Sequence, residues 1–398
     1  MKFAERISRL GTESAFSVLA VVNKLKAEGR DITSFSIGEP DFDTPQNIID
    51  CAKKALDGGF THYTPSAGIM DVRETIAKYV SKTRNIPVST SEVVITPGAK
   101  PVIFYTILAL INAGDEVIYP TPGFPIYESV INFVGGKAVP IALEEKNEFS
   151  FDVEKLKKLV TPKTKLIIIN SPQNPTGGVL PQETLDEIAK IAIEKDIMVL
   201  SDEIYSRLVY DAPFASIASI PGMKERTIIL DGFSKTYSMT GWRLGYGVMP
   251  TEMAEVVAKL ITNCESCTAT FTQMAGAEAL TGPQDAADAM RDEFLARRNL
   301  IVSELNKVPG FKCLSPKGAF YVYPNVTEAC KLIGAANSKE LQERLLHEGE
   351  VAVLARTAFG VKAEGENDEY IRLSYATSQE NIIKGVAKIK AFMEKNIK

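Results

Sequence analysis

Residues 228–247, IILDGFSKTYSMTGWRLGYG, decide the fold that we expect for this chain. A short apolar run stops here at Lys235, which lies among small and hydroxylated residues. An Ile- and Leu-rich run bounded by glycine predicts a buried strand of a parallel sheet. Because open α/β sheets bind ligands beyond the carboxyl ends of such strands, we expect Lys235 at a binding site. The alternative is that Lys235 and Arg243 are charges on a surface loop, the usual place for these residue types.

Polar side chains also follow two earlier apolar runs. Residues 166–169 lead to Asn174 in the loop NSPQNPTGG, and residues 197–200 lead to Asp202 and Tyr205. Apolar residues at helical spacing lie between these runs, which predicts repeated strand-helix-strand units. Right-handed crossovers then place the three strand ends side by side, so these residues and Lys235 are expected to converge. The alternative role of Asp202 is the N-cap of a following helix.

The sequence PGAKP predicts an anion-binding turn. It follows an expected strand at residues 93–96 and precedes an apolar helix that reaches Leu110. Free N–H groups at a helix N-terminus attract anions, so a phosphate is expected near Ala99 and Lys100. The next expected strand, residues 117–119, leads to Phe124 on a turn rich in proline and glycine. The alternative role of Phe124 is ordinary core packing.

The two ends of the chain predict a second, smaller domain. An amphipathic helix is expected over residues 17–29, followed by an arm whose Gly38 allows close approach of the backbone to a ligand. After residue 283 we expect a charged helix, short strands near 318–323 and 370–375, and a final amphipathic helix. The prediction is therefore an α/β protein with a large domain at residues 46–283. Residues 1–45, as an N-terminal arm, and 284–398 would form a smaller α+β domain.

Composition argues against several classes of partner. The 398 residues include 45 basic and 50 acidic ones, giving a net charge of -5 without long charged blocks. We therefore expect a small-molecule partner rather than nucleic acid or a membrane. The first residues lack the apolar core of a signal peptide, which predicts a cytoplasmic protein with reduced cysteines. With two histidines and a single CxxC, at Cys264 and Cys267, we expect no metal site.

The predicted cluster fits a phosphorylated aromatic aldehyde. No GxGxxG follows the first strand and no GxxxxGK[ST] occurs, so neither nucleotide-binding loop is predicted. A lysine, an aspartate, an amide, a phenol, an aromatic ring and an arginine match pyridoxal phosphate better. This cofactor needs a lysine of lowered pKa for its Schiff base. It also needs an anion that keeps the pyridine nitrogen protonated, so that the ring accepts electrons.

Four motifs resemble those of class I aminotransferases, a family of fold-type I pyridoxal phosphate enzymes: SPQNPTGG, SDEIYSRLVY, SKTYSMTGWRLGY and YIRLSYA. GEPDFDTP and THYTPSAG extend the resemblance over nearly the whole chain. The chain is most similar to the prokaryotic aspartate aminotransferase subgroup, which also contains alanine and aromatic enzymes. The resemblance implies a mostly parallel seven-stranded sheet in the large domain. It also implies transfer of an amino group between an L-amino acid and a 2-oxo acid by a ping-pong aldimine mechanism. Glutamate and 2-oxoglutarate would form one pair, with aspartate as the expected partner.

The resemblance further implies a role for each candidate residue. Lys235 would hold the cofactor as an internal aldimine and move the proton of the substrate Cα, with Asp202 and Tyr205 as the other catalytic residues. The ring and phosphate of the cofactor would be bound by Tyr63, Ala99, Lys100, Phe124, Asn174, Asp202, Tyr205, Ser234, Lys235 and Arg243. The substrate would be bound by Gly38, Asn174 and Arg372, with the arginine clamping the α-carboxylate. Tyr63 would reach the phosphate of the other subunit, which implies a homodimer with shared sites.

Several residues leave the substrate and the activity open. Gly232 stands where the family usually has a phosphate-binding serine, and Phe124 where aspartate enzymes commonly have tryptophan. Lys100 favours an acidic substrate, whereas Ala15 and Phe16 favour an apolar one. One alternative activity is that of a C–S (β) lyase of the same fold, which shares the lysine, aspartate and arginine. Another alternative is a non-catalytic regulatory protein that binds pyridoxal phosphate.

Overall fold

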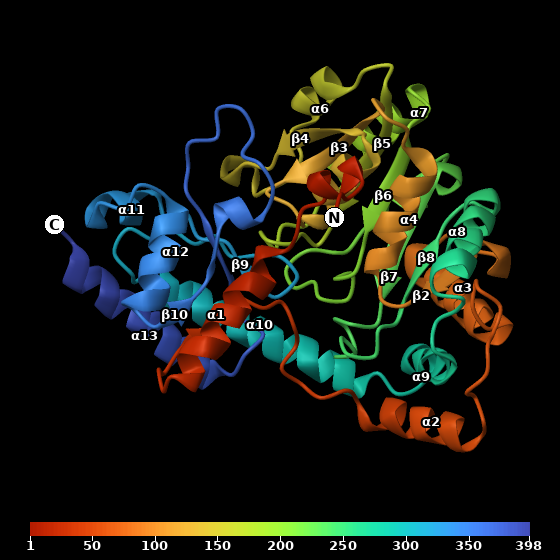
Figure 1. Cartoon of the computed structure of the whole chain (residues 1–398), viewed down its shortest axis with the longest axis horizontal. Helices are drawn as coiled ribbons and strands as arrows, with labels where there is room; N and C mark the ends of the chain where they lie inside the picture. Colours follow the sequence, from red (N-terminus) through yellow and green to blue (C-terminus); the bar gives the residue numbers. More distant parts are fainter.

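The computed structural model describes residues 1–398 and contains a large sheet beside a smaller α/β region (Figure 1). The large sheet has seven strands in the spatial order β2-β8-β7-β6-β5-β3-β4. Their bounds are β2 Val93–Thr96, β3 Glu116–Thr121, β4 Lys137–Ala142, β5 Thr164–Asn170, β6 Met198–Asp202, β7 Thr227–Gly232 and β8 Gly245–Val248. Only β8 runs against the other strands. The predicted α/β class and the mostly parallel seven-stranded sheet are confirmed.

Helices cover both faces of the large sheet. Alternate side chains of its strands point to opposite sides, and apolar side chains are buried on each side. In β5, Leu166 and Ile168 belong to one core cluster, and Ile167 and Ile169 to another. One face packs against helices α4 (Lys100–Leu110), α5 (Ile126–Val134) and α8 (Thr251–Cys264). The other packs against α2 (Gln46–Asp57), α3 (Met70–Arg84), α6 (Val153–Leu159), α7 (Gln182–Glu194) and α9 (Thr270–Thr281). Burial on both faces explains why these strands read as continuous apolar runs.

The order of the strands brings the predicted strand ends together. β5, β6 and β7 are adjacent, and Asn170 lies opposite Asp202, which in turn lies opposite Leu230. Two strands of the large sheet were not predicted from their residues. β8 is short and contains two glycines, and β4 contains Pro140. Proline is tolerated in β4 because that strand lies at the edge of the sheet, where part of the backbone needs no ladder partner.

The smaller region is built from both ends of the chain (Figure 1). Its strands are β1 (Thr33–Ser34) with β10 (Val351–Ala352), and the antiparallel set β9 (Tyr321–Val322), β11 (Leu354–Ala355) and β12 (Ile371–Ser374). Its helices are α1 (Ser14–Ala27), α10 (Asp285–Leu305), α11 (Thr327–Ile333), α12 (Ser338–His347) and α13 (Gln379–Asn396). α1 begins three residues earlier than predicted. The apolar face predicted for the last helix is buried in α13.

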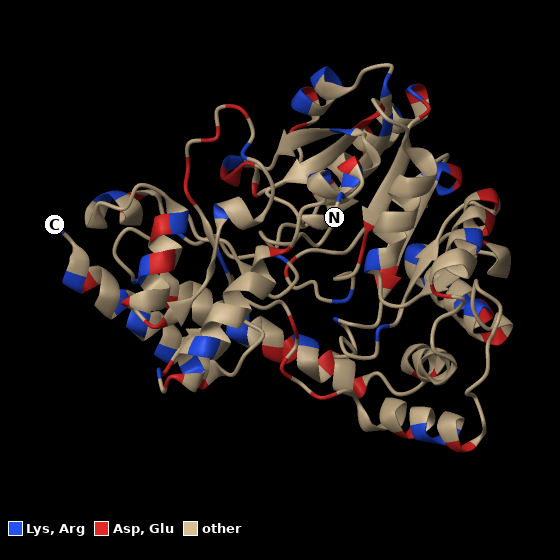
Figure 2. Ribbon diagram, viewed as in Figure 1, with Lys and Arg blue, Asp and Glu red and all other residues tan.

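The remaining regular elements are short 3₁₀ helices: η1 Glu5–Arg9, η2 Thr90–Glu92, η3 Glu145–Asn147, η4 Ile217–Ser219, η5 Lys224–Arg226 and η6 Arg356–Ala358. None of the helices combines the length and the apolar character that a membrane crossing requires. Basic and acidic residues are interspersed along exposed helices such as α10 and α12 (Figure 2). The mixed signs agree with the even spread of charge along the sequence.

Candidate active site

A cavity of about 490 Å³ lies at the carboxyl ends of β5, β6 and β7. Eleven of the twelve predicted site residues line it: Gly38, Ala99, Lys100, Phe124, Asn174, Asp202, Tyr205, Ser234, Lys235, Arg243 and Arg372. The twelfth, Tyr63, does not reach this cavity, and 87% of its surface is exposed. The structure thus brings together residues from five strand ends, from the N-terminal arm and from the smaller region.

Lys235 follows β7 and projects its amine into this cavity. Its Nζ donates a hydrogen bond to the carbonyl oxygen of Gly38 at 2.6 Å. Burial lowers the pKa of Lys235 to about 8, an effect that Glu39 opposes and that the positive charges of Arg372 and Arg243 increase. A lysine with this pKa is partly neutral near physiological pH, which a nucleophilic amine requires. The alternative of a surface loop is wrong for Lys235, whereas Arg243 is exposed although it lines the same cavity.

Asp202 is the last residue of β6, at the base of the cavity. Its carboxylate accepts hydrogen bonds from the Tyr127 hydroxyl at 2.5 Å and from the Ile204 N–H at 3.3 Å. Burial raises the pKa of Asp202 to about 6, although these two hydrogen bonds act in the opposite direction. A turn rather than a helix follows Asp202, so its alternative role as a helix N-cap is wrong. A buried carboxylate of this kind is suited to pair with a cationic ring nitrogen.

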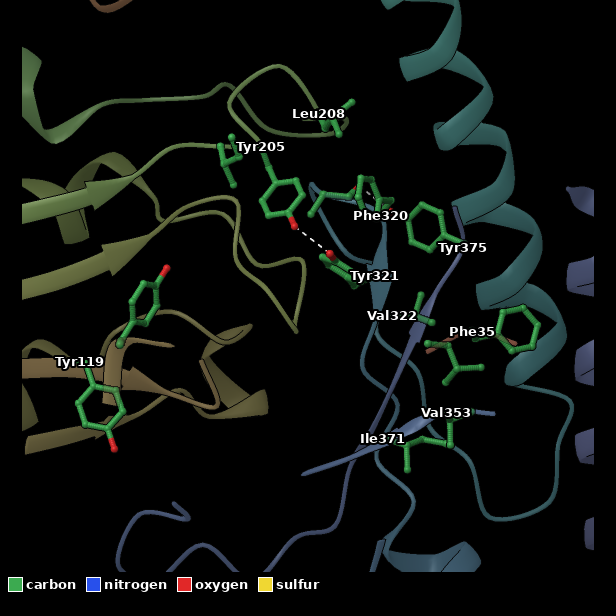
Figure 3. Close-up of a cluster of buried hydrophobic side chains, with 14 of the residues drawn as sticks. Phe35, Tyr119, Tyr205, Leu208, Phe320, Tyr321, Val322, Val353, Ile371 and Tyr375 are labelled. Carbon is green, nitrogen blue, oxygen red and sulfur yellow. Dashed lines mark hydrogen bonds between the residues drawn. The ribbon is translucent and has the colours of Figure 1, made fainter. Parts of the chain in front are cut away.

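Tyr205 links the large sheet to the smaller region. Its hydroxyl lies 2.8 Å from the hydroxyl of Tyr321, which belongs to β9 (Figure 3). Burial raises the pKa of Tyr205 well above its usual value, so the phenol stays protonated and can donate a hydrogen bond. Tyr321 also explains Gly38, because a Cβ at that position would lie 2.0 Å from the Tyr321 hydroxyl oxygen. Sequence analysis missed Tyr321, since nothing around it in the sequence distinguishes it from a core tyrosine.

An anion-binding corner lies where α4 begins. The N–H of Ala99 donates no hydrogen bond within the chain, and Ser234 and Arg243 line the same cavity. Gly98 has a φ of +87°, and a Cβ there would lie 2.2 Å from Nη2 of Arg243. Glycine therefore allows the guanidinium to pack against this turn. The free N–H, the hydroxyl and the guanidinium together can bind a phosphate.

Arg372, on β12, is buried at the opposite end of the cavity. Its Nη1 donates to Oδ1 of Asn174 at 3.2 Å, and its Nη2 donates to the carbonyl oxygen of Ser36 at 2.5 Å. Its Nε is buried without a hydrogen-bond partner, and no carboxylate pairs with the guanidinium. The alternative of a surface ion pair is therefore wrong. A buried guanidinium whose N–H donors are not all used within the chain can bind a carboxylate.

Phe124 and Lys100 lie near the mouth of the cavity, together with a residue that sequence analysis missed. The ring of Phe124 packs edge-to-face against Tyr127, with ring centroids 5.8 Å apart. The amine of Lys100 lies 5.4 Å from the centroid of the Phe124 ring and forms an ion pair with Glu13. Glu13 also lines the cavity, with 16% of its side chain exposed. It precedes α1, and no local sequence signal connects it with a turn nearly ninety residues later.

A second charged cluster lies behind Asp202, outside the cavity. Arg84 donates to Glu203 at 2.8 Å and to Asp231 at 2.7 Å, and all three side chains are at most 5% exposed. Ser206 and Tyr246 also donate to Asp231. Sequence analysis missed this cluster because Arg84 comes from α3, far along the chain from both acids. The cluster satisfies buried charges next to the strand that carries Asp202.

Comparison with known proteins agrees with this geometry. A sequence model of the family described as aminotransferase class I and II matches residues 30–389. The chain belongs to this family. This aminotransferase is 37% identical over 398 residues to an aspartate aminotransferase of Bacillus subtilis, and the match covers all of both chains. It is 42% identical over 355 residues to an aromatic-amino-acid aminotransferase of Thermococcus litoralis, covering 88% of this chain and 89% of that one.

Solved structures lead to the same family. The aspartate aminotransferase of Thermus thermophilus with maleate superimposes with a TM-score of 0.92 at 34% identity, covering 98% of this chain and 100% of the other. The chain is therefore a transaminase, acting on an amino acid and a 2-oxo acid, with pyridoxal 5'-phosphate as cofactor. The site fits that cofactor, because the amine of Lys235 with its lowered pKa, the buried acid of Asp202 and the free N–H of Ala99 provide the three attachments that it needs.

Proposed function

We propose that this aminotransferase exchanges the amino group of an L-amino acid with 2-oxoglutarate, and that aspartate is its preferred partner. Relatives named aspartate aminotransferase support this choice, since one matches the full length of the chain. Aromatic amino acids are the second choice, because a relative with that name has similar identity. Alanine remains a further candidate donor from the sequence.

The observation that carries the proposal is the unpaired Arg372. Five arginines are buried, and the other four have carboxylate partners within the chain: Arg84, Arg297, Arg298 and Arg356. A buried guanidinium without a counter-ion is costly unless a ligand provides one. The α-carboxylate shared by all amino-acid and 2-oxo-acid substrates is the ligand that would complete it, with the free N–H of Gly38 beside it.

Pyridoxal phosphate, when bound, supplies a protonated ring that accepts the electrons released when the Cα–H bond of the substrate breaks. Asp202 would hold the ring nitrogen in its protonated form. Asn174 and Tyr205 would donate hydrogen bonds to the ring oxygen, and Phe124 would lie against the ring face. The phosphate would be held by the backbone N–H groups of Ala99 and Lys100 and by Ser234 and Arg243.

Lys235 would have two tasks. It would bind the aldehyde carbon of the cofactor covalently, which the lowered pKa of its amine favours. Once the substrate displaces it, its Nζ would take the proton from the substrate Cα and deliver it to the carbon that receives the amino group. One amine thus acts as general base and then as general acid. The ring centroid of Phe320 lies 5.7 Å from Nζ, so an aromatic side chain packs beside the amine that would carry the proton.

A division into two domains forms part of the proposal. Residues 46–283 would be the large cofactor-binding domain, and residues 1–45 with 284–398 the smaller one. The pairing of β1 with β10 supports this division, because it ties the N-terminal arm to the C-terminal part of the chain. Movement of the smaller domain would carry Gly38 and Arg372 toward or away from Lys235, and so close the site over the substrate.

We also propose a homodimer in which Tyr63 completes the phosphate site of the partner subunit. The exposure of Tyr63 and of apolar side chains in the N-terminal segment, including Phe3 and Ile7, supports a second copy as the covering surface. Hybrid dimers of Lys235→Ala and Tyr63→Ala chains test this. One of the two sites in each hybrid then has both native residues, so the mixture should regain activity that neither parent shows. No recovery would contradict shared sites. A cytoplasmic location stays a prediction from the sequence.

The proposed reaction is tested one amino acid at a time. The protein loaded with pyridoxal phosphate is mixed with a single amino acid, and the visible absorbance of the bound cofactor is followed in a stopped-flow instrument. We expect fast loss with glutamate and with aspartate, and recovery when 2-oxoglutarate is added. Formation of pyruvate and ammonia from cystathionine would instead indicate the C–S lyase. No change with any amino acid would indicate a regulatory protein and contradict the proposal.

A further inference from the structure

Glu13 is the one carboxylate that pairs with a cation in the wall of the active-site cavity. Its side chain forms an ion pair with Lys100, and both residues line the cavity with Phe124. The charge of Glu13 opposes the lowering of the pKa of Lys235, after the larger contribution of Glu39, and it also opposes the lowering of the pKa of Arg372. Glu13 is therefore part of the substrate pocket rather than of the outer surface.

The backbone around Glu13 is anchored, which fixes the position of this acid. The Gly11 N–H donates to the hydroxyl of Ser129 on α5 at 2.9 Å, and Arg9 donates to the carbonyl oxygen of Asn132 at 2.9 Å. Helix α1 begins directly after Glu13, at Ser14. The carboxylate thus lies between α1 and the hydrogen bonds that tie the preceding segment to α5, and it meets Lys100 at the start of α4.

In the closed ion pair the opposite charges of Glu13 and Lys100 offset each other. A substrate with an uncharged side chain can enter beside the closed pair and contact the apolar wall, which includes Phe16, Ile37 and Leu354. A substrate with a second carboxylate needs a cation, and Lys100 is the lysine in the wall besides Lys235. The second carboxylate must therefore compete with Glu13 for Lys100.

We propose that Glu13 and Lys100 form an ion-pair switch that sets the class of substrate side chain. The pair stays closed when the amino acid is uncharged, and it opens when a dicarboxylic substrate takes the place of Glu13 on Lys100. This inference rests on the proposed function and deepens it, because one pocket would then serve both aspartate and aromatic donors. Ser14, whose buried hydroxyl has no hydrogen-bond partner, lines the same cavity and would donate a hydrogen bond to the released carboxylate.

Glu13→Gln separates the two classes of substrate. The variant keeps the size of the side chain but no longer neutralises Lys100. We expect the ratio of kcat/KM for aspartate to that for phenylalanine to rise about tenfold, since a charge-assisted hydrogen bond of this kind is worth one to two powers of ten. Lys100→Met should move the same ratio in the opposite direction by a similar factor. The matched control is Glu28→Gln at the other end of α1, which makes the same change of charge outside the cavity.

A binding measurement removes the chemical steps from the comparison. Maleate and 3-phenylpropionate serve as dicarboxylic and apolar probes, and their dissociation constants are measured by calorimetry with the cofactor-loaded protein. In Glu13→Gln we expect the Kd of maleate to fall about tenfold, with a change of less than about threefold for 3-phenylpropionate. A Glu13→Gln variant in which both ligands and both donors change by the same factor would overturn the switch, because Glu13 would then be structural.

The two proposals fail in different ways. If no amino acid changes the absorbance of the bound cofactor, the proposed transamination is wrong, whatever Glu13 does. If transamination proceeds and the ratio of aspartate to phenylalanine stays within twofold of the parent protein in Glu13→Gln, only the switch is wrong. An equal shift of the ratio in Glu28→Gln would also overturn the switch, since the effect would come from net charge.

Discussion

Two buried clusters of charge lie close together in this protein and are built in opposite ways. Arg84 is enclosed by Glu203 and Asp231, and each charge in that cluster has a partner from the chain itself. Arg372 is also buried and Lys235 is half-buried, but both have hydrogen bonds only to neutral oxygens. The first cluster is complete within the folded chain. The second is incomplete until a ligand brings the missing charge.

This difference separates stability from function. Removing one partner from a completed buried cluster leaves an uncompensated charge, which destabilises the fold. Removing a cation that has no partner in the chain removes the unfavourable free energy of burying an unpaired charge. Such a change weakens ligand binding instead of the fold. We therefore expect variants of the two clusters to affect different measurements.

Lys235→Ala should lower kcat by about 10⁴-fold or more, because the general base is removed. The variant should unfold at the same temperature as the parent or a higher one, since it loses an amine whose burial is unfavourable. Steady-state kinetics and thermal unfolding by circular dichroism provide the two measurements. Lys235→Arg is the matched control, because it keeps the charge, lacks a primary amine and should be equally inactive. Substantial activity in either variant would contradict the assignment.

Arg372→Leu should lower kcat/KM by about 10³-fold for every amino acid, since each loses the guanidinium that binds its α-carboxylate. The midpoint of unfolding should change little, because no carboxylate in the chain loses a partner. The comparison of aspartate, phenylalanine and alanine as donors is the informative part. A loss confined to one donor would place Arg372 at the side chain of the substrate instead.

Arg84→Leu should act on stability. It leaves Glu203 and Asp231 buried side by side without a cation, which should lower the free energy of unfolding by about 3–5 kcal/mol. Urea unfolding followed by fluorescence measures this change. Protein that still folds should retain kcat/KM within about tenfold of the parent value at low temperature, because Arg84 does not line the cavity. An Arg84→Leu protein as stable as the parent would contradict a stabilising role for this cluster.

Asp202→Asn tests the link between burial and pH. The pKa of Asp202 is raised to about 6 in the folded protein, above the value near 3.8 of an exposed aspartate. The folded state therefore binds a proton more tightly than the unfolded state, and stability falls as pH rises from about 4 to about 6. Asparagine has no such dependence. In protein stripped of cofactor, the free energy of unfolding of Asp202→Asn should exceed that of the parent by an amount that grows across this window. The difference should reach roughly 2–3 kcal/mol at pH 7.

The bound cofactor provides the control for this titration. A protonated ring nitrogen next to Asp202 would favour the carboxylate, so the advantage of Asp202→Asn should shrink or reverse when pyridoxal phosphate is present. Chemical unfolding curves at pH 4, 5, 6 and 7, with and without cofactor, measure both effects. An advantage that does not depend on pH would mean that Asp202 titrates as an exposed acid.

The sequence predicted the parts of the site that depend on strand ends. Asn174, Asp202 and Lys235 follow apolar runs, and the rules for parallel sheets bring such ends together. The residues that it missed depend on packing across the chain. Tyr321 and Glu13 have no local pattern, and their positions follow from how the smaller region and the N-terminal segment pack on the sheet. The Arg84 cluster was missed for the same reason.

The fold shows the same division between local and distant information. Long apolar runs such as β5 were predicted, because burial on both faces leaves a clear pattern. β8 and β4 were not, since glycine and proline weaken the pattern and neighbouring strands define these elements. The domain boundaries and the dimer stay predictions, and the hybrid-dimer experiment is the sharpest test of the latter.

The antiparallel strand β8 has one further consequence, for engineering the protein. Gly232 at the end of β7 lies opposite Gly245 at the start of β8, so the segment that carries Lys235 and Arg243 is clamped at its base. Adding or deleting one residue in this closed segment would move the amine and the guanidinium relative to each other. Replacing side chains at its tip, such as Gly241, where a Cβ would meet no atom within 4 Å, would not. A mutant library aimed at new substrates should therefore substitute residues of this segment and keep its length.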